Sequence, residues 1–317
     1  MQALVIDNGV HFDSGFARPV IKPGEALIKT VLAGICATDL ELLHGYANFQ
    51  GVPGHEFVGV VEVADNPSLI GQRVVGEINC PCKSCATCLR GDTNHCPNRL
   101  ALGIRHKNGV FADYFTLPQA NLHIVPAGIS DRQAVFTEPL AAALEILEQV
   151  HIAPGDTVVV LGDGRLGILI AQVLALTGCD LVVVGRHPSK WGLLLNKSIK
   201  VCLAKDLEEG YLAKVVVECS GSSGGFTQAR KLVQPKGYLV LKSTFNSDTL
   251  VDLSSLVVDE ISVIGSRCGP FSTALRLLAS GNVEVEEMIG GEFHLKNGVE
   301  AFKKAKEKGV VKILLKP

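Results

Sequence analysis

Three features that this chain lacks exclude whole classes of function. It has no basic excess, because 30 Lys and Arg face 32 Asp and Glu, a formal net charge of −2, whereas nucleic-acid-binding domains carry concentrated positive charge. It has no apolar run long enough to span a bilayer, since the most apolar stretch, 166–176, contains Gln172. Its N-terminus lacks the basic and apolar segments of a signal peptide. We therefore expect a cytoplasmic protein with neither nucleic acid nor membrane as partner.

What the chain does contain is typical of a globular protein of two domains, with 317 residues, 47% of them hydrophobic. Up to Pro139 the pattern is β-rich, with short apolar or alternating runs between turn residues, at 26–32, 57–63 and 73–78. Beyond it, buried strands alternate with helical patterns. That change predicts an α/β domain with a parallel sheet covered on both faces.

The elements expected after Pro139 are strands at 157–161, 181–184, 215–219 and 238–242, and a helix at 166–176. After Ile264 we expect helices at 271–280 and 301–308 and a strand at 310–315. No internal repeat or low-complexity linker interrupts this order.

A glycine-rich segment, GDGRLG at 162–167, follows one predicted strand directly and opens the helix after it. In a dinucleotide-binding fold the first glycine permits a tight turn, the second lets the backbone approach a pyrophosphate, and the third allows close helix–strand packing. The helix N-terminus then offers free N–H groups to the phosphates. Glycines in turns are common, but this strand–loop–helix context predicts a nucleotide site.

The end of the next strand bears on which dinucleotide binds. An acidic residue there would accept hydrogen bonds from the ribose 2′-hydroxyl of NAD, yet the chain reads Val-Gly-Arg-His-Pro-Ser-Lys at 184–190. Two cations, Arg186 and Lys190, with His187 between them, suit a 2′-phosphate instead. A solvated surface turn is the alternative. The pattern favours NADP(H) over NAD(H).

Five of the ten cysteines cluster between Cys80 and Cys96, which in a reducing compartment indicates a metal site and not disulfides. The most regular spacing, CxxCxxCx7C, suits a closed tetrahedral zinc site that holds a loop poor in apolar residues. An iron–sulfur cluster is the other metal candidate, and Cys80 competes for a place. The expected structural zinc ligands are Cys82, Cys85, Cys88 and Cys96. The isolated Cys179, Cys202 and Cys219 are interpreted as small buried apolar residues.

Four further residues have donor atoms of the kinds that bind catalytic zinc. Cys36 and His55 offer one sulfur and one nitrogen, and Glu56 and Glu138 offer one or two oxygens. Each alone has an ordinary structural explanation; Glu138, for example, suits the first turn of a helix. Together they match a zinc site that keeps an open coordination position.

The order of these motifs resembles one family. CxTD at 36–39, GHE at 54–56, the cysteine lobe, EPL at 138–140 and the GxGxxG segment follow one another as in the zinc-containing medium-chain alcohol dehydrogenases. The similarity covers essentially the whole chain, including GSRCG and KILLKP near its end.

That resemblance implies a role for each matching residue. Cys36 and His55 would bind the catalytic zinc, Glu56 would bind it or exchange with it, and Glu138 would take the third-ligand position that sorbitol and sugar dehydrogenases fill with Glu. Thr38 would relay the substrate proton, while Asp39 would orient His55. The chain departs from the family at Glu41, where a relay histidine is frequent. His44 is a possible substitute or a plain surface histidine.

The resemblance also implies a fold and a cofactor site. A GroES-like β-barrel domain at 1–139 and 268–317 would enclose an inserted Rossmann domain at 140–267, with the active site in the cleft between them. The residues expected to contact the cofactor are Gly162, Gly164, Arg165, Leu166, Gly167, Arg186, His187, Lys190, Ser243, Thr244, Ser266 and Lys312.

The expected reaction is zinc-assisted hydride transfer between an alcohol or polyol and NAD(P), with two zincs per subunit. Glu138 tilts the substrate towards polyols or sugars by analogy. Phe57, Tyr46 and Phe111 are candidates to line the pocket. By analogy with the family we expect a homodimer or homotetramer. The rivals are a zinc-free enone or quinone reductase, a non-catalytic cofactor-binding protein on the same scaffold, and a zinc-ribbon nucleic-acid module.

Overall fold

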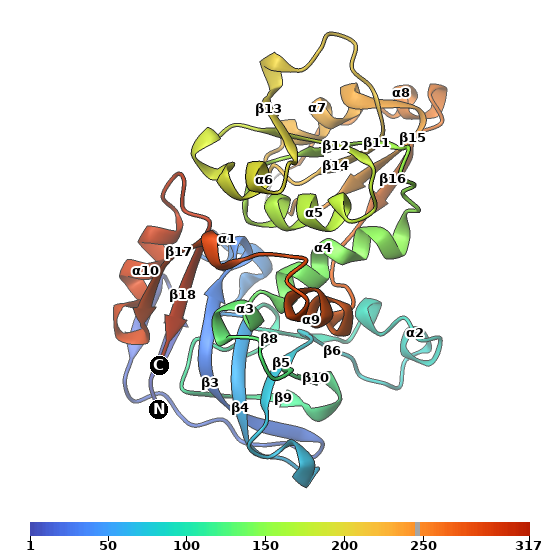
Figure 1. Cartoon of the computed structure of the whole chain (residues 1–317). Helices are drawn as coiled ribbons and strands as arrows, with labels where there is room; N and C mark the ends of the chain where they lie inside the picture. Colours follow the sequence, from blue (N-terminus) through green and yellow to red (C-terminus); the bar gives the residue numbers. More distant parts are fainter. Residues whose placement is uncertain (245–247) are drawn as a thin grey trace. The chain divides into compact units, whose positions relative to one another are not determined.

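The computed structural model describes residues 1–244 and 248–317, which form two compact units (Figure 1). The first, called the catalytic unit below, contains Met1–Glu138 and Phe271–Pro317; the second, the nucleotide unit, contains Pro139–Pro270. None of the helices in the described ranges is long and apolar enough to cross a membrane.

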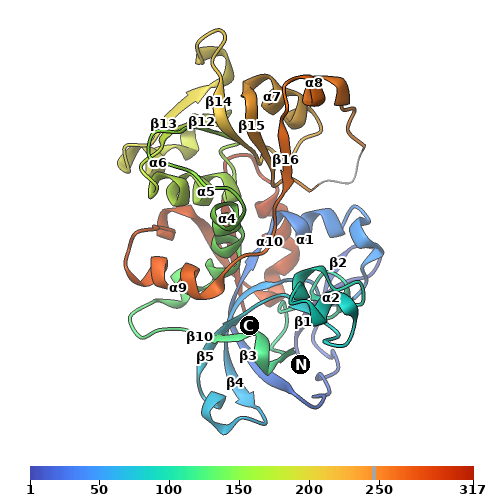
Figure 2. The ribbon, with the colours of Figure 1, turned by 90° about the vertical axis from the view of Figure 1, so that its right-hand side faces the viewer.

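The catalytic unit is built around a seven-stranded sheet in the order β10-β5-β4-β3-β18-β17, with β9 also paired to β3. Its long central strand β3 runs antiparallel to β4, β9 and β18, so segments from both ends of the chain meet there (Figure 2). The strands of this sheet are β3 (Glu25–Ile35), β4 (Glu56–Val63), β5 (Arg73–Gly76), β9 (Tyr114–Pro118), β10 (Leu122–Ile124), β17 (Ile289–His294) and β18 (Lys312–Lys316).

Smaller elements complete this unit. Two further sheets pair β1 (Ala3–Ile6) with β2 (Val10–Asp13), and join β6 (Asn79–Cys80), β7 (Leu100–Leu102) and β8 (His106–Lys107). The helices are α1 (Ala37–Leu42), α2 (Ala86–Leu89), α3 (Asp131–Ala134), α9 (Phe271–Ala279) and α10 (Gly298–Ala305), and α4 (Thr137–Gln149) starts here and continues into the nucleotide unit.

The nucleotide unit contains a six-stranded parallel sheet in the order β13-β12-β11-β14-β15-β16. This order reverses direction beside β11, the crevice at which open parallel sheets bind nucleotides. Helices α5 and α6 cover one face and α7 and α8 the other (Figure 1). The strands are β11 (Thr157–Leu161), β12 (Asp180–Gly185), β13 (Lys200–Leu203), β14 (Ala213–Glu218), β15 (Val233–Leu241) and β16 (Ser262–Gly265); the helices are α5 (Arg165–Ala175), α6 (Gly192–Asn196), α7 (Gly224–Leu232) and α8 (Leu253–Val258).

Each unit buries its own core. In the catalytic unit, Phe57 meets Phe115 edge-on with ring centroids 4.7 Å apart, and Phe111 meets Phe302 at 5.9 Å. In the nucleotide unit the core is made by the valines and leucines that β11, β12, β14 and β15 direct towards their covering helices. Runs that are apolar on both faces suit a parallel sheet covered by helices, which is why Val158, Val159 and Val160 are all fully buried.

Candidate active site

The turn from β3 into α1 positions the first candidate zinc ligand, Cys36. Its backbone N–H donates to Asp39 Oδ2 at 2.7 Å, which caps the helix and fixes the Cys36 side chain at the helix start. The Thr38 hydroxyl lies 3.9 Å from Cys36 Sγ, so the expected relay hydroxyl is beside the expected ligand. Glu41 lies one turn further along α1, and His44 is exposed beyond its end.

His55 follows a left-handed glycine turn, with φ of 96° at Gly54, and begins the approach to β4. Its Nδ1 lies 3.4 Å from Oδ1 of the fully buried Asp39, which also accepts the Gly54 N–H at 3.2 Å. Burial acts to lower the pKa of His55, but the Asp39 carboxylate, with help from Cys36, holds it well above the ordinary 6.5. Asp39 therefore faces the ring at Nδ1 and acts on it through its negative charge; Nδ1 makes no hydrogen bond to the residues that the structure describes.

Glu56 is the first residue of β4 and is 1% exposed. Its Oε2 accepts a hydrogen bond from the ammonium of Lys312, which is 2% exposed on β18. Its Oε1 is buried and has no hydrogen-bond partner among residues 1–244 and 248–317. A buried carboxylate oxygen without a partner is costly, so this atom suits a bound cation.

Cys36, His55 and Glu56 each place one donor atom within 4.8 Å of the others. One sulfur, one nitrogen and one oxygen, all largely buried, fit a zinc ion that keeps a position for substrate. Glu138, expected as the third ligand, is half-buried in the first turn of α4 and does not belong to this group. The structure thus brings together three of the four residues singled out from the sequence.

The cysteine lobe brings its four thiols together as a second group, Cys82, Cys85, Cys88 and Cys96. Sulfur–sulfur distances of 3.5, 3.8 and 3.5 Å join Cys85 to Cys88, Cys85 to Cys96, and Cys96 to Cys82. Bonds of about 2.3 Å in a tetrahedral zinc site give sulfur–sulfur edges of about 3.8 Å, so the cluster fits one zinc ion. Backbone and hydroxyl donation from Ser84 lowers the pKa of Cys82 to about 5 and favours the thiolate.

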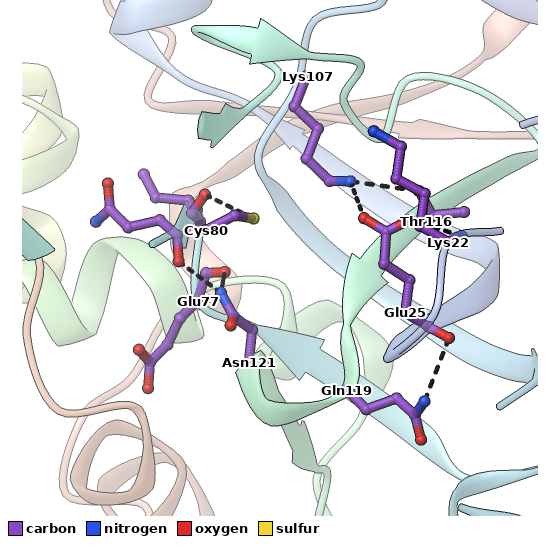
Figure 3. Close-up of polar contacts among 10 residues, drawn as sticks. Lys22, Glu25, Glu77, Cys80, Lys107, Thr116, Gln119 and Asn121 are labelled. Atoms are coloured by element: carbon purple, nitrogen blue, oxygen red, sulfur yellow. Dashed lines mark hydrogen bonds and ion pairs between the residues drawn. The ribbon is translucent and has the colours of Figure 1, made fainter. Parts of the chain in front are cut away.

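Cys80 lies outside this cluster. Its thiol donates to the Ile78 carbonyl at 3.9 Å, close to the Asn121 amide that bridges the carbonyls of Glu77 and Asn79 (Figure 3). Burial raises the pKa of Cys80 to about 11, so it stays a neutral thiol. The competition for a metal position is therefore decided against Cys80 by its location.

The glycine-rich loop has the geometry expected of a phosphate-binding turn. Gly162 has a φ of 129°, and a Cβ there would meet the Cys219 carbonyl oxygen at 2.7 Å. A Cβ on Gly167 would meet the Gly162 carbonyl oxygen at 2.1 Å, so only glycine allows α5 to pack this close. Gly164 caps α5 with open space in front of it, where the backbone N–H groups of the first turn are directed. The loop therefore fits a dinucleotide pyrophosphate.

The other residues expected to contact the cofactor differ in their exposure and in their hydrogen bonds. Arg165 and Leu166 start α5, Arg186 is exposed, and His187 and Lys190 lie half-buried in the turn after β12. Thr244 is exposed, but the Ser243 hydroxyl accepts the Gly221 N–H and the Ser266 hydroxyl accepts from Lys242. Lys312, also expected at a cofactor phosphate, is buried in the catalytic unit, where its ammonium donates to Glu56.

The three aromatic side chains suggested for a substrate pocket pack within the catalytic unit. Phe57 and Phe111 are 2% and 0% exposed within the core, and Tyr46 packs against the cluster of Ile6, Leu42 and Phe49. Two features that sequence reasoning did not predict are more informative: the pairing of Lys312 with Glu56, and the burial of Asp163 inside the glycine-rich loop. The only signal for either was a charge in an otherwise buried segment.

Comparisons with known proteins agree with this architecture. Residues 22–127 match the alcohol dehydrogenase GroES-like domain. The chain is 33% identical to an erythritol/L-threitol dehydrogenase of Mycolicibacterium smegmatis, over 95% of this chain and 93% of the relative, and 31% identical to a sorbitol dehydrogenase of Halalkalibacterium halodurans, over 100% and 99%. The chain belongs to the zinc-containing medium-chain dehydrogenases.

Among solved structures, this medium-chain dehydrogenase superposes on a Sinorhizobium meliloti 1021 protein that is described as a zinc-binding dehydrogenase and is bound to NADP. The TM-score is 0.89 at 27% identity, with 100% of this chain and 99% of the other covered. These similarities confirm the predicted family, the GroES-like plus Rossmann fold and the enzyme class. The chain is an oxidoreductase that transfers hydride between an alcohol or polyol and a nicotinamide cofactor.

Proposed function

We propose that this enzyme is an NADP-preferring, zinc-dependent polyol dehydrogenase in which Cys36, His55 and Glu56 hold the catalytic metal. The observation that carries the proposal is the buried group of one sulfur, one nitrogen and one oxygen donor within 4.8 Å. When bound, zinc supplies Lewis-acid polarisation of the substrate hydroxyl and the nicotinamide accepts the hydride. Zinc-free reductases have no use for this ligand set.

The protein's own side chains supply placement and proton movement. The Thr38 hydroxyl, beside Cys36, accepts the proton of the substrate hydroxyl and passes it outward. Asp39 holds the His55 ring in position through Nδ1. Beyond Thr38, Glu41 and His44 are the candidates for the outer part of the proton path. Replacing Thr38 with Val keeps the shape and removes the hydroxyl, so it should lower kcat while leaving zinc content unchanged; a kcat equal to that of the wild type would contradict the relay.

Two carboxylates compete for the third ligand position. The unpartnered Oε1 of Glu56 supports Glu56, and the similarity to sorbitol dehydrogenases supports Glu138. We propose Glu56 as the resting ligand and Glu138 as its replacement during turnover. Metal analysis of Glu56→Gln and Glu138→Gln separates them: the first should lose zinc from the catalytic site and the second should retain it. The reverse result would assign the resting ligand to Glu138.

The cofactor preference follows from charge. β12 ends on Gly185 without an acidic side chain. Burial is the largest cause that lowers the pKa of Lys190, and the nearby charges of Arg165 and Arg186 lower it further, so three basic side chains lie close together. Such a cluster suits a phosphate. Arg186→Ala should reduce kcat/KM for NADP by roughly tenfold or more, the order expected for a lost charge-assisted hydrogen bond, and change that for NAD little. Equal losses with both cofactors would contradict the preference.

The substrate class rests on the relatives named for erythritol, threitol and sorbitol. A panel of simple alcohols, polyols and aldoses, each assayed with NAD and with NADP, is the direct test. We expect the highest kcat/KM for a polyol of several carbons. A preference for simple monohydric alcohols would retain the reaction class and overturn the polyol assignment.

The subunits are proposed to pair through β16, the edge strand of the nucleotide unit's sheet. Val263 on this strand is 42% exposed, and α8, which leads into it, exposes Leu253, Val257 and Val258 by 68%, 76% and 80%. An apolar sheet edge is a template for pairing with another chain. Light scattering should find a dimer that Val263→Lys converts to monomer. Ile124→Lys, on the exposed edge strand β10, is the matched control and should stay dimeric.

The domain roles and the compartment complete the proposal. We assign residues 1–139 with 268–317 to the GroES-like catalytic domain and 140–267 to the Rossmann domain.

The ten cysteines all lie in described ranges and none forms a disulfide, which supports a reducing, cytoplasmic location. Two zincs per subunit are expected, one in each cluster.

A further inference from the structure

Asp163, the second residue of the glycine-rich segment, is a buried carboxylate that no cofactor motif requires. It is 4% exposed and reaches from the start of α5 to the end of β12. There its Oδ2 accepts the backbone N–H groups of Arg186 and His187 at 2.9 and 2.6 Å and the indole N–H of Trp191 at 2.9 Å. Its Oδ1 lies 3.1 Å from His187 Nδ1. The turn at 186–191 is therefore tied to a single side chain.

The Asp163 carboxylate is ionised, and both of its oxygens have hydrogen-bonding partners within the protein. Burial acts to raise the pKa of Asp163, but the donors from Trp191, His187 and Arg186 lower it below the ordinary 3.8. With four donors around its two oxygens, Asp163 has little capacity left for a ribose hydroxyl. Its contacts serve the protein and not the cofactor directly.

Gly185 and Asp163 fit each other sterically. A Cβ on Gly185 would meet Asp163 Oδ2 at 2.5 Å, Cγ at 2.7 Å and Cβ at 2.8 Å. Gly185 ends β12, where NAD-selective folds carry the carboxylate that binds the ribose 2′-hydroxyl. In this chain Asp163 fills the space beside that position, so the strand end accepts no side chain.

We propose that Asp163 is a positioning residue that sets the preference for NADP. It holds the turn at 186–191 in the conformation that presents Arg186 and Lys190 to the 2′-phosphate, and it excludes a ribose-binding carboxylate from position 185. The inference rests on the NADP preference proposed above.

A purely electrostatic role for Asp163 and a positioning role predict opposite effects of removing its charge on binding of the 2′-phosphate. Asp163→Asn deletes a negative charge close to the proposed phosphate position, so a purely coulombic role would make the 2′-phosphate bind more tightly. The amide also presents an NH2 group to N–H donors and offers one acceptor oxygen where the carboxylate offered two. A positioning role therefore predicts weaker binding.

The experiment titrates the full-length enzyme with adenosine 2′,5′-bisphosphate and with 5′-AMP, which differ only in the 2′-phosphate. The wild type should bind the bisphosphate at least about tenfold more tightly, as expected for charge-assisted hydrogen bonds. In Asp163→Asn this ratio should fall towards one while the affinity for 5′-AMP changes little. Asp180→Asn is the matched control, because Asp180 lies at the other end of β12 in an exposed ion pair with Lys200, and it should keep the wild-type ratio.

Trp191 is the only tryptophan of the chain, so its fluorescence reports on the Asp163 contact without labelling. Acrylamide should quench it more strongly in Asp163→Asn than in the wild type or in Asp180→Asn. If Asp163→Asn does not fold, Trp191→Phe removes one donor and keeps an aromatic side chain, and it should lower the bisphosphate-to-AMP ratio by a smaller factor.

A reciprocal exchange tests the steric half of the inference. Gly185→Asp alone should weaken binding of both ligands, since the new side chain collides with Asp163. Combining it with Asp163→Gly should restore 5′-AMP binding and reverse the preference towards NAD.

The outcomes distinguish the two proposals. A wild type that binds the two adenosine ligands equally would overturn the NADP preference, and the Asp163 inference with it. A wild type that discriminates, together with an Asp163→Asn variant whose ratio is unchanged or higher, would overturn the Asp163 inference alone. An equal loss in Asp180→Asn would also overturn it, because the effect would then be one of general charge.

Discussion

The ammonium of Lys312 and a carboxylate oxygen of Glu56 form a hydrogen-bonded ion pair in the interior of the catalytic unit, where they are 2% and 1% exposed. The pair joins β18, near the end of the chain, to β4. The second Glu56 oxygen has no hydrogen-bond partner among residues 1–244 and 248–317, and a carboxylate oxygen of Glu56 lies within 4.8 Å of the Cys36 and His55 donor atoms. Lys312 thus balances the charge of a proposed zinc ligand.

Removing one member of this pair should be costly. Lys312→Met leaves the Glu56 carboxylate buried without its partner and should lower the free energy of unfolding by roughly 3–5 kcal/mol. Urea unfolding of the zinc-loaded protein measures this.

Lys304→Met, which breaks the exposed pair with Glu307, serves as the control and should change stability by about 0.5 kcal/mol or less. A Lys312→Met variant no less stable than the control would contradict this account of the pair.

Replacing a proposed catalytic ligand should separate chemistry from folding. Cys36→Ser or His55→Ala should abolish turnover, while thermal stability and binding of the dinucleotide to the nucleotide unit stay close to wild type. Isothermal titration with NADP and a melting curve check both parts. Loss of cofactor binding together with activity would point to a structural role for these residues.

The cysteine lobe should respond differently, because its proposed zinc holds a loop that has few apolar contacts of its own. Cys88→Ser should remove one zinc per subunit and expose residues 82–96 to proteolysis. Cys80→Ser, which alters a thiol outside the cluster, should leave the zinc content unchanged. Full zinc content in Cys88→Ser would exclude the four-thiolate site.

Stability in acid should depend on Glu25, whose Oε1 accepts from Lys107 at 2.7 Å while Lys107 also contacts Thr116 (Figure 3). Burial acts to raise the pKa of Glu25, but Lys107 lowers it, and the net value lies below the ordinary 4.5. A lowered folded-state pKa stabilises the fold above 4.5, and this contribution is lost as the pH falls through the folded-state value.

Glu25→Gln should therefore be less stable than the wild type at neutral pH, with the difference closing below pH 4.5. Urea unfolding across this pH range measures the difference. Glu62→Gln, in a more exposed pair with Arg18, is the control and should show a smaller difference at neutral pH. A Glu25→Gln deficit that persists in acid would contradict the assignment.

The sequence predicted the central strands best. β11 was expected at 157–161 and spans Thr157–Leu161, because a Val-rich run between turn residues has few other interpretations. The edge strands β13 and β16 were not predicted, since KVCL and SVIG lack the continuous apolar pattern of a buried strand. Helix α10 begins at Gly298, three residues before the expected 301, because glycine gives no helical signal.

The site was predictable where its residues are close in sequence or follow a family pattern, as with CxTD, GHE and the cysteine lobe. Contacts between residues far apart in the sequence could not be predicted. Lys312 and Glu56 are 256 residues apart, and Asp163 reaches Trp191 over 28 residues. No local pattern encodes such pairs, and a charged residue within an apolar segment is the only hint that a partner exists.

One measurement decides whether this chain oxidises polyols with NADP through a zinc held by Cys36, His55 and Glu56. Polyol-dependent NADPH formation is followed in the wild type and in Cys36→Ser, with the zinc content of both samples determined in parallel. We expect two zincs per subunit and turnover for the wild type, and one zinc without turnover for Cys36→Ser. Undiminished turnover in a Cys36→Ser sample that has lost that zinc would contradict it.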